Sequence, residues 1–307
     1  MKRLMIGVLL VVVAVNVSAQ RGSGTGRQTP DPAAGEALAG LTAAQRADFT
    51  AGKGDFTEVE KVTDGLGPVF NERSCVACHS VPAIGGGSNR LVTRFATRVN
   101  GLFDALASLG GSLVQDHALN QRDGVTHNFR PEVVPAAATI IVRRRTTPVF
   151  GLGLVDATPD SDFIAAAAQQ AARNDGVAGR VNMVDNIRAG MKTAGKFGWK
   201  AQVPSIFQFS GDAYLNEMGI TTSDFPNENC PQGNCAELAF NPAPGINDDG
   251  SGPIALTNYM SLLAAPPRGT LTGDVAAGEA TFGRIGCTAC HVATQHTGPN
   301  AIAPLDR

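Results

Sequence analysis

The chain has 307 residues, of which 43% are hydrophobic and 17% are charged, and its formal net charge is -2. This composition can bury a core, which excludes an intrinsically disordered chain, and the weak charge without a basic stripe argues against a nucleic-acid partner. The length leaves room for about two domains of roughly 100 to 200 residues each.

The N-terminus has the pattern of an export signal. Lys2 and Arg3 precede an apolar run over residues 4–15, and the small residues of Val17-Ser18-Ala19 follow it. This order predicts a signal peptide over residues 1–19 and a periplasmic protein; an uncleaved anchor is the alternative. The run is shorter than the roughly 20 residues of a membrane span, and no later segment offers one. We therefore expect no transmembrane span in the mature chain.

Beyond this signal the chain alternates between helical patterns and loops. Residues 20–34 are rich in Gly, Ser, Thr and Pro, which predicts a flexible leader. Gly85-Gly86-Gly87-Ser88 favours a turn, although glycine also lets a backbone approach a flat cofactor. Caps, apolar periodicity and stop signals predict four helices, over residues 43–50, 161–173, 254–263 and 274–284. We expect a mainly α fold.

Two copies of the pattern C-x-x-C-H, at residues 75–79 and 287–291, are the strongest functional signal. The pattern attaches c-type haem, because cysteines three apart lie on one side of a helical turn, where both sulfurs reach the vinyl groups of one porphyrin. The adjacent histidine then binds the iron. The predicted attachment residues are Cys75, Cys78, Cys287 and Cys290, and the predicted proximal ligands are His79 and His291. The sequence thus predicts two covalently bound haem c groups.

A zinc site and a redox dithiol are the alternatives for these four cysteines. Zinc ribbons separate their cysteine pairs by roughly 15 to 20 residues, far less than the gap in this chain. A redox dithiol is expected beside a βαβ pattern, and it would leave the histidine in both copies to coincidence. The remaining pair, Cys230 and Cys235, predicts a small disulfide loop in an oxidising compartment; two free thiols are the alternative.

The surroundings of the motifs resemble known haem proteins. Phe70 and Phe282 each stand five residues before the first cysteine of a motif, which implies two related haem modules. Gly278 stands one helical turn before Phe282, as in the opening helix of class I cytochrome c; a plain core role for Phe282 fits the same spacing. Residues 64–71, 145–157, 195–202 and 219–223 carry a second resemblance, to the di-haem oxidoreductase family. The members of this family are peroxidase-like or thiol oxidoreductase-like proteins, and the family is related to di-haem cytochrome c peroxidases.

This resemblance implies an exported di-haem c-type oxidoreductase, peroxidase-like, that moves electrons between two covalent haems. Its partners would be a redox protein such as a small cytochrome, and peroxide or another small substrate. The alternative is a non-catalytic electron-transfer cytochrome of the periplasm.

The expected architecture is two cytochrome c-like haem modules joined by a loop-rich segment. The first module covers residues 35–150, a connecting region with the disulfide loop covers residues 151–265, and a second module begins in residues 266–307. Only 16 residues follow His291, fewer than a complete cytochrome c module needs. We therefore expect a truncated chain and an incomplete second module.

Several further residues are candidates for roles around the haems. Trp199, the only tryptophan, is a candidate electron relay or a core anchor. Arg143-Arg144-Arg145 reads as a solvated face or as partners of haem propionates. The loop Asn247-Asp248-Asp249-Gly250-Ser251 could hold calcium, but it lacks an alternating carboxylate ladder, so a solvated turn is favoured.

Candidates for the distal ligand of the first haem are His117, His127, Met183, Met191 and Met218, each of which also fits a core methionine or a surface histidine. Met183 and Met191 are preferred because they stand near an expected helical stretch before Trp199.

Overall fold

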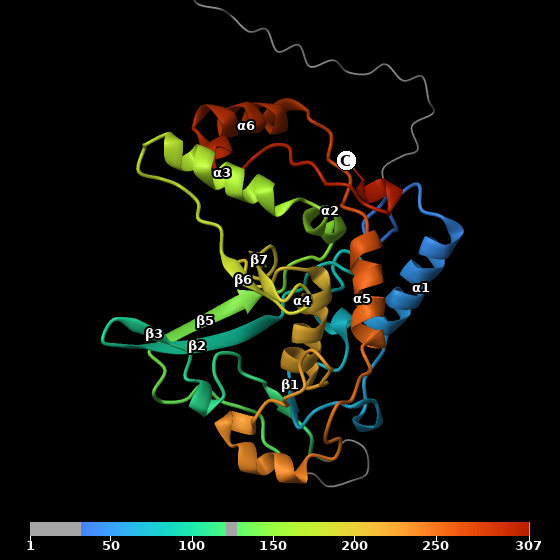
Figure 1. The fold of residues 1–307 in the computed structure, drawn as a ribbon, viewed down its shortest axis with the longest axis vertical. Helices are drawn as coiled ribbons and strands as arrows, with labels where there is room; N and C mark the ends of the chain where they lie inside the picture. Colours follow the sequence, from blue (N-terminus) through green and yellow to red (C-terminus); the bar gives the residue numbers. More distant parts are fainter. Residues whose placement is uncertain (1–31, 121–127, 307) are drawn as a thin grey trace, which may run out of the picture. The chain divides into compact units, whose positions relative to one another are not determined.

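The computed structural model describes residues 32–120 and 128–306, and Figure 1 shows how their helices and strands are arranged. The predicted signal peptide, most of the predicted leader and His127 lie outside the described residues. Within the described part, none of the helices combines the length and the apolar character that crossing a membrane requires.

All four predicted helices are confirmed, and the described part adds two that the sequence patterns did not reveal. Thr42 begins the first helix with a capping box, in which its hydroxyl accepts from the Gln45 backbone and the Gln45 side chain accepts in return. The helices are α1 (Ala43–Thr57), α2 (Leu152–Asp156), α3 (Asp160–Ala172), α4 (Ile206–Ala213), α5 (Ser251–Leu262) and α6 (Gly273–Arg284). Short helical turns, mostly 3-10, connect them.

The prediction of a mainly α fold is wrong, because 35% of the described residues are helical and 15% lie in strands, so the fold mixes both classes. Three small antiparallel sheets are present in the described residues: β1 (Val69–Phe70) with β4 (His117–Ala118), β3 (Leu102–Asp104) with β2 (Leu91–Val99) and β5 (Ile140–Arg145), and β6 (Met183–Asn186) with β7 (Met191–Ala194). The register of β2 and β5 pairs Leu91 with Arg145, far apart in the sequence. Such pairings depend on tertiary folding, so a local pattern does not reveal them.

Helix α1 extends through Gly52 to Thr57, whereas the sequence patterns predicted an end at residue 50. Gly52 instead lies where α1 crosses α5, and a Cβ atom there would come within 2.1 Å of the Ala255 carbonyl oxygen. The two helices run side by side in Figure 1. The glycine therefore serves close helix packing, a purpose that outweighs its poor helix propensity.

Aromatic rings join these helices to the loop that follows the first motif. The ring of Tyr259 on α5 lies 5.1 Å from that of Phe49 and 4.9 Å from that of Phe56, both on α1. The Tyr259 hydroxyl donates to the Ile84 carbonyl at 2.9 Å. This cluster is the centre of the largest core and anchors the segment around residues 75–87.

The second motif has less support from the core. Helix α6 has no buried residue, whereas α1 buries Phe49, Gly52 and Phe56. Arg173, at the end of α3, donates to the Ala289 carbonyl at 3.1 Å, which ties the second motif to the neighbouring helix seen in Figure 1. Further on, Ile302 packs against the main core, and Leu305 is buried. The expected module boundaries stay a prediction.

Candidate functional site

Both C-x-x-C-H motifs adopt the same backbone turn. In the first, the His79 amide donates to the Cys75 carbonyl at 2.9 Å, and the Cys78 amide donates to it at 3.2 Å. In the second, the corresponding bonds from His291 and Cys290 to the Cys287 carbonyl are 2.9 Å and 3.1 Å. One helical turn therefore holds the two cysteines and the histidine in the arrangement that attachment of one porphyrin requires.

The ring of His79 is oriented for metal binding. Its Nδ1 lies 3.2 Å from the Gly86 carbonyl oxygen. A carbonyl only accepts, so Nδ1 carries the proton and the lone pair of the neutral ring lies on Nε2, which is the usual arrangement of a metal-ligating histidine. Burial lowers the pKa of His79, which keeps the ring neutral. These features fit a haem iron at Nε2.

The glycine-rich segment supplies the carbonyl that orients His79. Gly86 lies in the turn that the sequence favoured, and a Cβ atom there would approach the Val81 carbonyl oxygen to 2.1 Å. Val81 and Gly87 exchange backbone hydrogen bonds of 2.8 Å, which close the turn. A larger residue at position 86 would displace the acceptor of the His79 proton.

The cysteines of the first motif lie in a partly enclosed environment. Burial, with the Glu60 carboxylate next in weight, raises the pKa of the Cys75 thiol to about 12, so the free thiol is protonated. Burial also raises the pKa of Cys78, and the Arg90 guanidinium opposes that shift. The hydroxyl of Ser74, directly before Cys75, is buried without a hydrogen-bond partner in the described part. A bound cofactor is one group that can satisfy such an atom.

A phenylalanine from the preceding helix meets each motif histidine edge-on. The Phe282 and His291 ring centroids are 5.5 Å apart with planes at 62°, and those of Phe56 and His79 are 6.0 Å apart at 63°. The counterpart of Phe282 is thus Phe56 on α1, and not Phe70 as the spacing suggested. Phe70 lies in β1 and stacks on the His117 ring at 5.8 Å. Both motifs thus have a phenylalanine of the preceding helix packed against their histidine, although the chain between α1 and the first motif is longer than that between α6 and the second.

The distal-ligand candidates are scattered. Met183 and Met191 lie in the hairpin of β6 and β7, 43% and 64% exposed, so the expected helical stretch around them is wrong. Met218 is buried in the main core. His117 is half-buried and lies beside Asp116, with Nδ1 2.6 Å from its Oδ1. A ligand role for any of these residues stays a prediction.

A half-buried carboxylate that the sequence patterns did not reveal, that of Glu217, acts electrostatically on the first motif. The Asn71 Nδ2 donates to Glu217 Oε2 at 2.7 Å, while the Asn71 Oδ1 accepts from the Asp116 amide at 3.2 Å. Burial raises the pKa of Glu217, and its charge acts on the thiols of both Cys75 and Cys78. The only signal in the sequence is an acid inside a largely apolar stretch. This burial favours the protonated form of Glu217.

Trp199 is 52% exposed, so the core-anchor interpretation does not hold. Arg144, on β5, lies 4.8 Å from the centre of its ring. The adjacent Arg145 donates to the Ser88 carbonyl at 2.9 Å and also bonds Asn89. The basic cluster therefore alternates between the faces of a strand. Its pairing with haem propionates and the relay role of Trp199 stay predictions.

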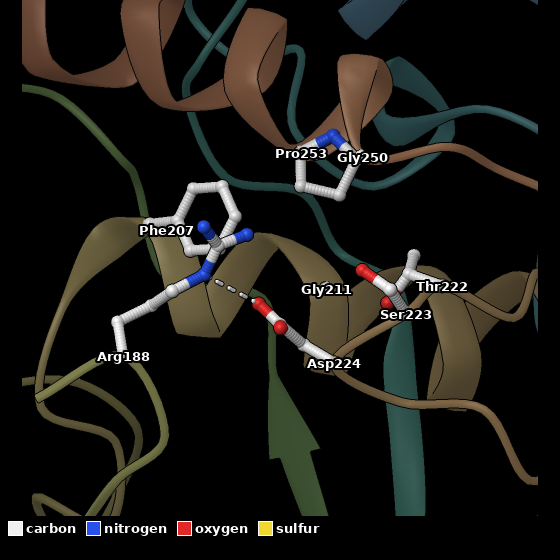
Figure 2. A pocket seen from close by; sticks show the side chains of 8 residues that line it. All are labelled: Arg188, Phe207, Gly211, Thr222, Ser223, Asp224, Gly250 and Pro253. Carbon is white, nitrogen blue, oxygen red and sulfur yellow. Dashed lines mark hydrogen bonds and ion pairs between the residues drawn. The ribbon is translucent and has the colours of Figure 1, made fainter. Parts of the chain in front are cut away.

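Two other features lie apart from the motif residues. Cys230 and Cys235 form a disulfide. Figure 2 shows a depression in which Arg188 lies across the Phe207 ring, 4.2 Å from its centre, and bonds Asp224 at 2.9 Å. None of the residues that line it belongs to a motif, and its free volume is about 0 Å³. This depression therefore has no room for a substrate.

Two turns of the same geometry, each with a histidine after the second cysteine, define a protein built to carry two haem groups. A family model described as "Di-haem oxidoreductase, putative peroxidase" matches residues 122–303, more than half of the chain, including the second motif. The chain therefore belongs to the di-haem oxidoreductase family, and the family name implies two haems. No curated protein and no solved structure matches the chain.

Proposed function

We propose that this di-haem oxidoreductase is an exported peroxidase that binds two haems through thioether bonds and moves electrons between them. The observation that carries the proposal is the shared turn of the two motifs, with His79 Nε2 left free by the bond from Nδ1 to the Gly86 carbonyl. The N-terminal pattern of Lys2, Arg3 and the apolar run supports export to the periplasm.

Reduction of hydrogen peroxide to two waters consumes two electrons and two protons. Haem, when bound, supplies the redox chemistry and a metal position for an oxygen ligand. The chain has to supply protons, and Glu217 is the group we assign to this step, because burial raises its pKa and its charge reaches the first motif. Asn71 positions the Glu217 carboxylate through the 2.7 Å bond.

Covalent attachment is tested by replacing each cysteine pair with serine in the mature, haem-loaded protein. Cys75→Ser with Cys78→Ser should lose one of two haem equivalents that survive denaturation, and Cys287→Ser with Cys290→Ser should lose the other. The double change at Cys230 and Cys235, which form a disulfide, is the matched control and should keep both haems. Release of all pigment from the denatured wild-type protein would refute the thioether bonds.

Peroxidase activity is tested by turnover of hydrogen peroxide with a reduced small cytochrome as electron donor. A ferric haem with an open side gives a high-spin component in the absorption spectrum, which the proposal expects. The second candidate, a non-catalytic electron-transfer cytochrome, is favoured if both haems are low-spin and the fully loaded protein shows no turnover.

A further inference from the structure

The hairpin of β2 and β3 ends in three exposed apolar side chains, which we call the hairpin tip. The turn Asn100-Gly101, in which both residues have a positive φ, joins the two strands. Beside this turn Val99 is 52% exposed, Leu102 75% and Phe103 67%. Strand β5 pairs with β2 only as far as Ala96, so the tip extends past the end of β5, as Figure 1 shows.

The hairpin tip is apolar on both faces of the sheet. Val99 lies opposite Leu102, so these two side chains share one face, whereas Phe103 lies opposite Arg98 and belongs to the other. Three adjacent side chains of this kind form a patch, unlike the scattered single residues that protein surfaces normally show. A protein partner that covered one face would leave the other in water. A lipid layer surrounds both faces at once, because it is fluid.

The sheet behind the tip is strongly basic, although the whole chain has a net charge of -2. Its three strands contain one acid, Asp104, and five arginines: Arg94, Arg98, Arg143, Arg144 and Arg145. Within residues 32–120 and 128–306, none of these arginines forms an ion pair with an acid. Arg98 donates to the Gly101 carbonyl at 3.0 Å, which keeps its charge at the tip.

The register of the strands places two exposed arginines on the same face as Val99. Side chains alternate along a strand and opposed residues point the same way, so Val99, Arg143 and Arg145 share a face. Both arginines are exposed, and Ile141 on this face is 57% exposed. The middle of the face, at Phe95, is covered by the small second core. The exposed residues therefore follow the tip and the edge strand β5.

This order of apolar and basic groups is complementary to an anionic lipid surface. Apolar side chains at the boundary between headgroups and acyl chains, with arginines at the level of the phosphates, are typical of surface-bound segments. Thr93, the partner of Arg143, stands six residues from Val99, which is roughly 20 Å along the strand. The hairpin thus has to lie obliquely on the surface for tip and arginine to engage together.

We propose that the hairpin tip docks this protein on a membrane surface that contains anionic phospholipid. Val99, Leu102 and Phe103 enter the headgroup boundary, and Arg98 and Arg143 bind lipid phosphates, for which the guanidinium fork is suited. The proposal goes beyond the peroxidase function and does not depend on it.

The test is flotation of the mature, haem-loaded protein with vesicles of phosphatidylglycerol and phosphatidylcholine in equal parts, in about 0.15 M NaCl. We expect the wild type to float with these vesicles and not with vesicles of phosphatidylcholine alone. The double variant Leu102→Asn with Phe103→Asn should bind at least tenfold more weakly, with its haem content unchanged because both side chains are exposed. Arg143→Gln should bind about fivefold more weakly, which is the effect of one basic residue at such a surface.

Two matched controls separate the hairpin from general surface effects. Phe240→Asn removes an aromatic ring that is 77% exposed and lies outside the sheet. Arg46→Gln removes an exposed arginine from α1. Both variants should float as the wild type does.

Three results would overturn the proposal. The first is a wild type that does not float at up to about 1 mM phosphatidylglycerol, the limit of weak binding. The second is equal affinity of the wild type and the double tip variant. The third is equal binding to both kinds of vesicle that persists in about 1 M NaCl, where charges are screened within about 3 Å. If light scattering instead shows a dimer that the tip variant converts to a monomer, without flotation of either, the tip joins two copies of the chain and the proposal fails.

Discussion

Replacing Glu60 by glutamine should stabilise the protein at pH 8. Glu60 has a pKa of about 7 in the folded chain against 4.5 for the free side chain, so the folded state favours its protonated form. This difference corresponds to an upper value of about 3 kcal/mol, at about 1.4 kcal/mol per tenfold change in proton affinity. Glu60 lines a pocket together with Asp55, Glu58, Asp64 and Asp248. Since this pocket opens to solvent, we expect a gain of about 1 to 3 kcal/mol in the free energy of unfolding.

The sign of this effect depends on pH. A raised pKa favours folding at low pH, and this contribution is lost as the pH rises from 4.5 through about 7. The advantage of Glu60→Gln should therefore be near zero below pH 4.5 and reach its full size above pH 7. Urea denaturation followed by circular dichroism, at several pH values, measures it.

A variant that is no more stable than the wild type at pH 8 would refute the reasoning, because burial and like charges would then impose no cost on the Glu60 carboxylate. Asp48→Asn, which removes one charge from an exposed position of α1, serves as the control and should leave the pH dependence unchanged.

Three further changes test other parts of the structure. Phe56→Ala should cost about 3 to 5 kcal/mol in the free energy of unfolding measured in urea, because Phe56 is 3% exposed and packs on the His79 ring; a loss below about 1 kcal/mol would show that the contact is unimportant. Opening the short Cys230–Cys235 loop with serines should cost about 2 kcal/mol, and equal urea midpoints for variant and wild type would contradict this value. Glu217→Gln should slow peroxide turnover and alter its pH profile with haem content unchanged, whereas an unaltered profile would remove Glu217 from the proton step.

Local sequence signals were reliable where caps and apolar periodicity agreed, and they failed for the helical stretch expected around Met183 and Met191, which is a β-hairpin. The four predicted helices are present, and Thr42 caps α1 with Gln45 as its partner. The two C-x-x-C-H motifs form the same turn, because their hydrogen bonds join residues no more than four apart. Capping and short turns depend on neighbours in the chain, so the sequence by itself determined them.

Only the tertiary structure decided which distant segments meet. The pairing of β2 with β5 overturned the mainly α prediction, and Phe56 replaced Phe70 as the partner of a motif histidine. The pocket that Asp55, Glu60 and Asp248 line likewise required α1 and α5 to pack side by side, which the close approach at Gly52 allows. Contacts across many residues depend on which surfaces bury together, and the free energy of that burial belongs to the whole fold rather than to any one segment.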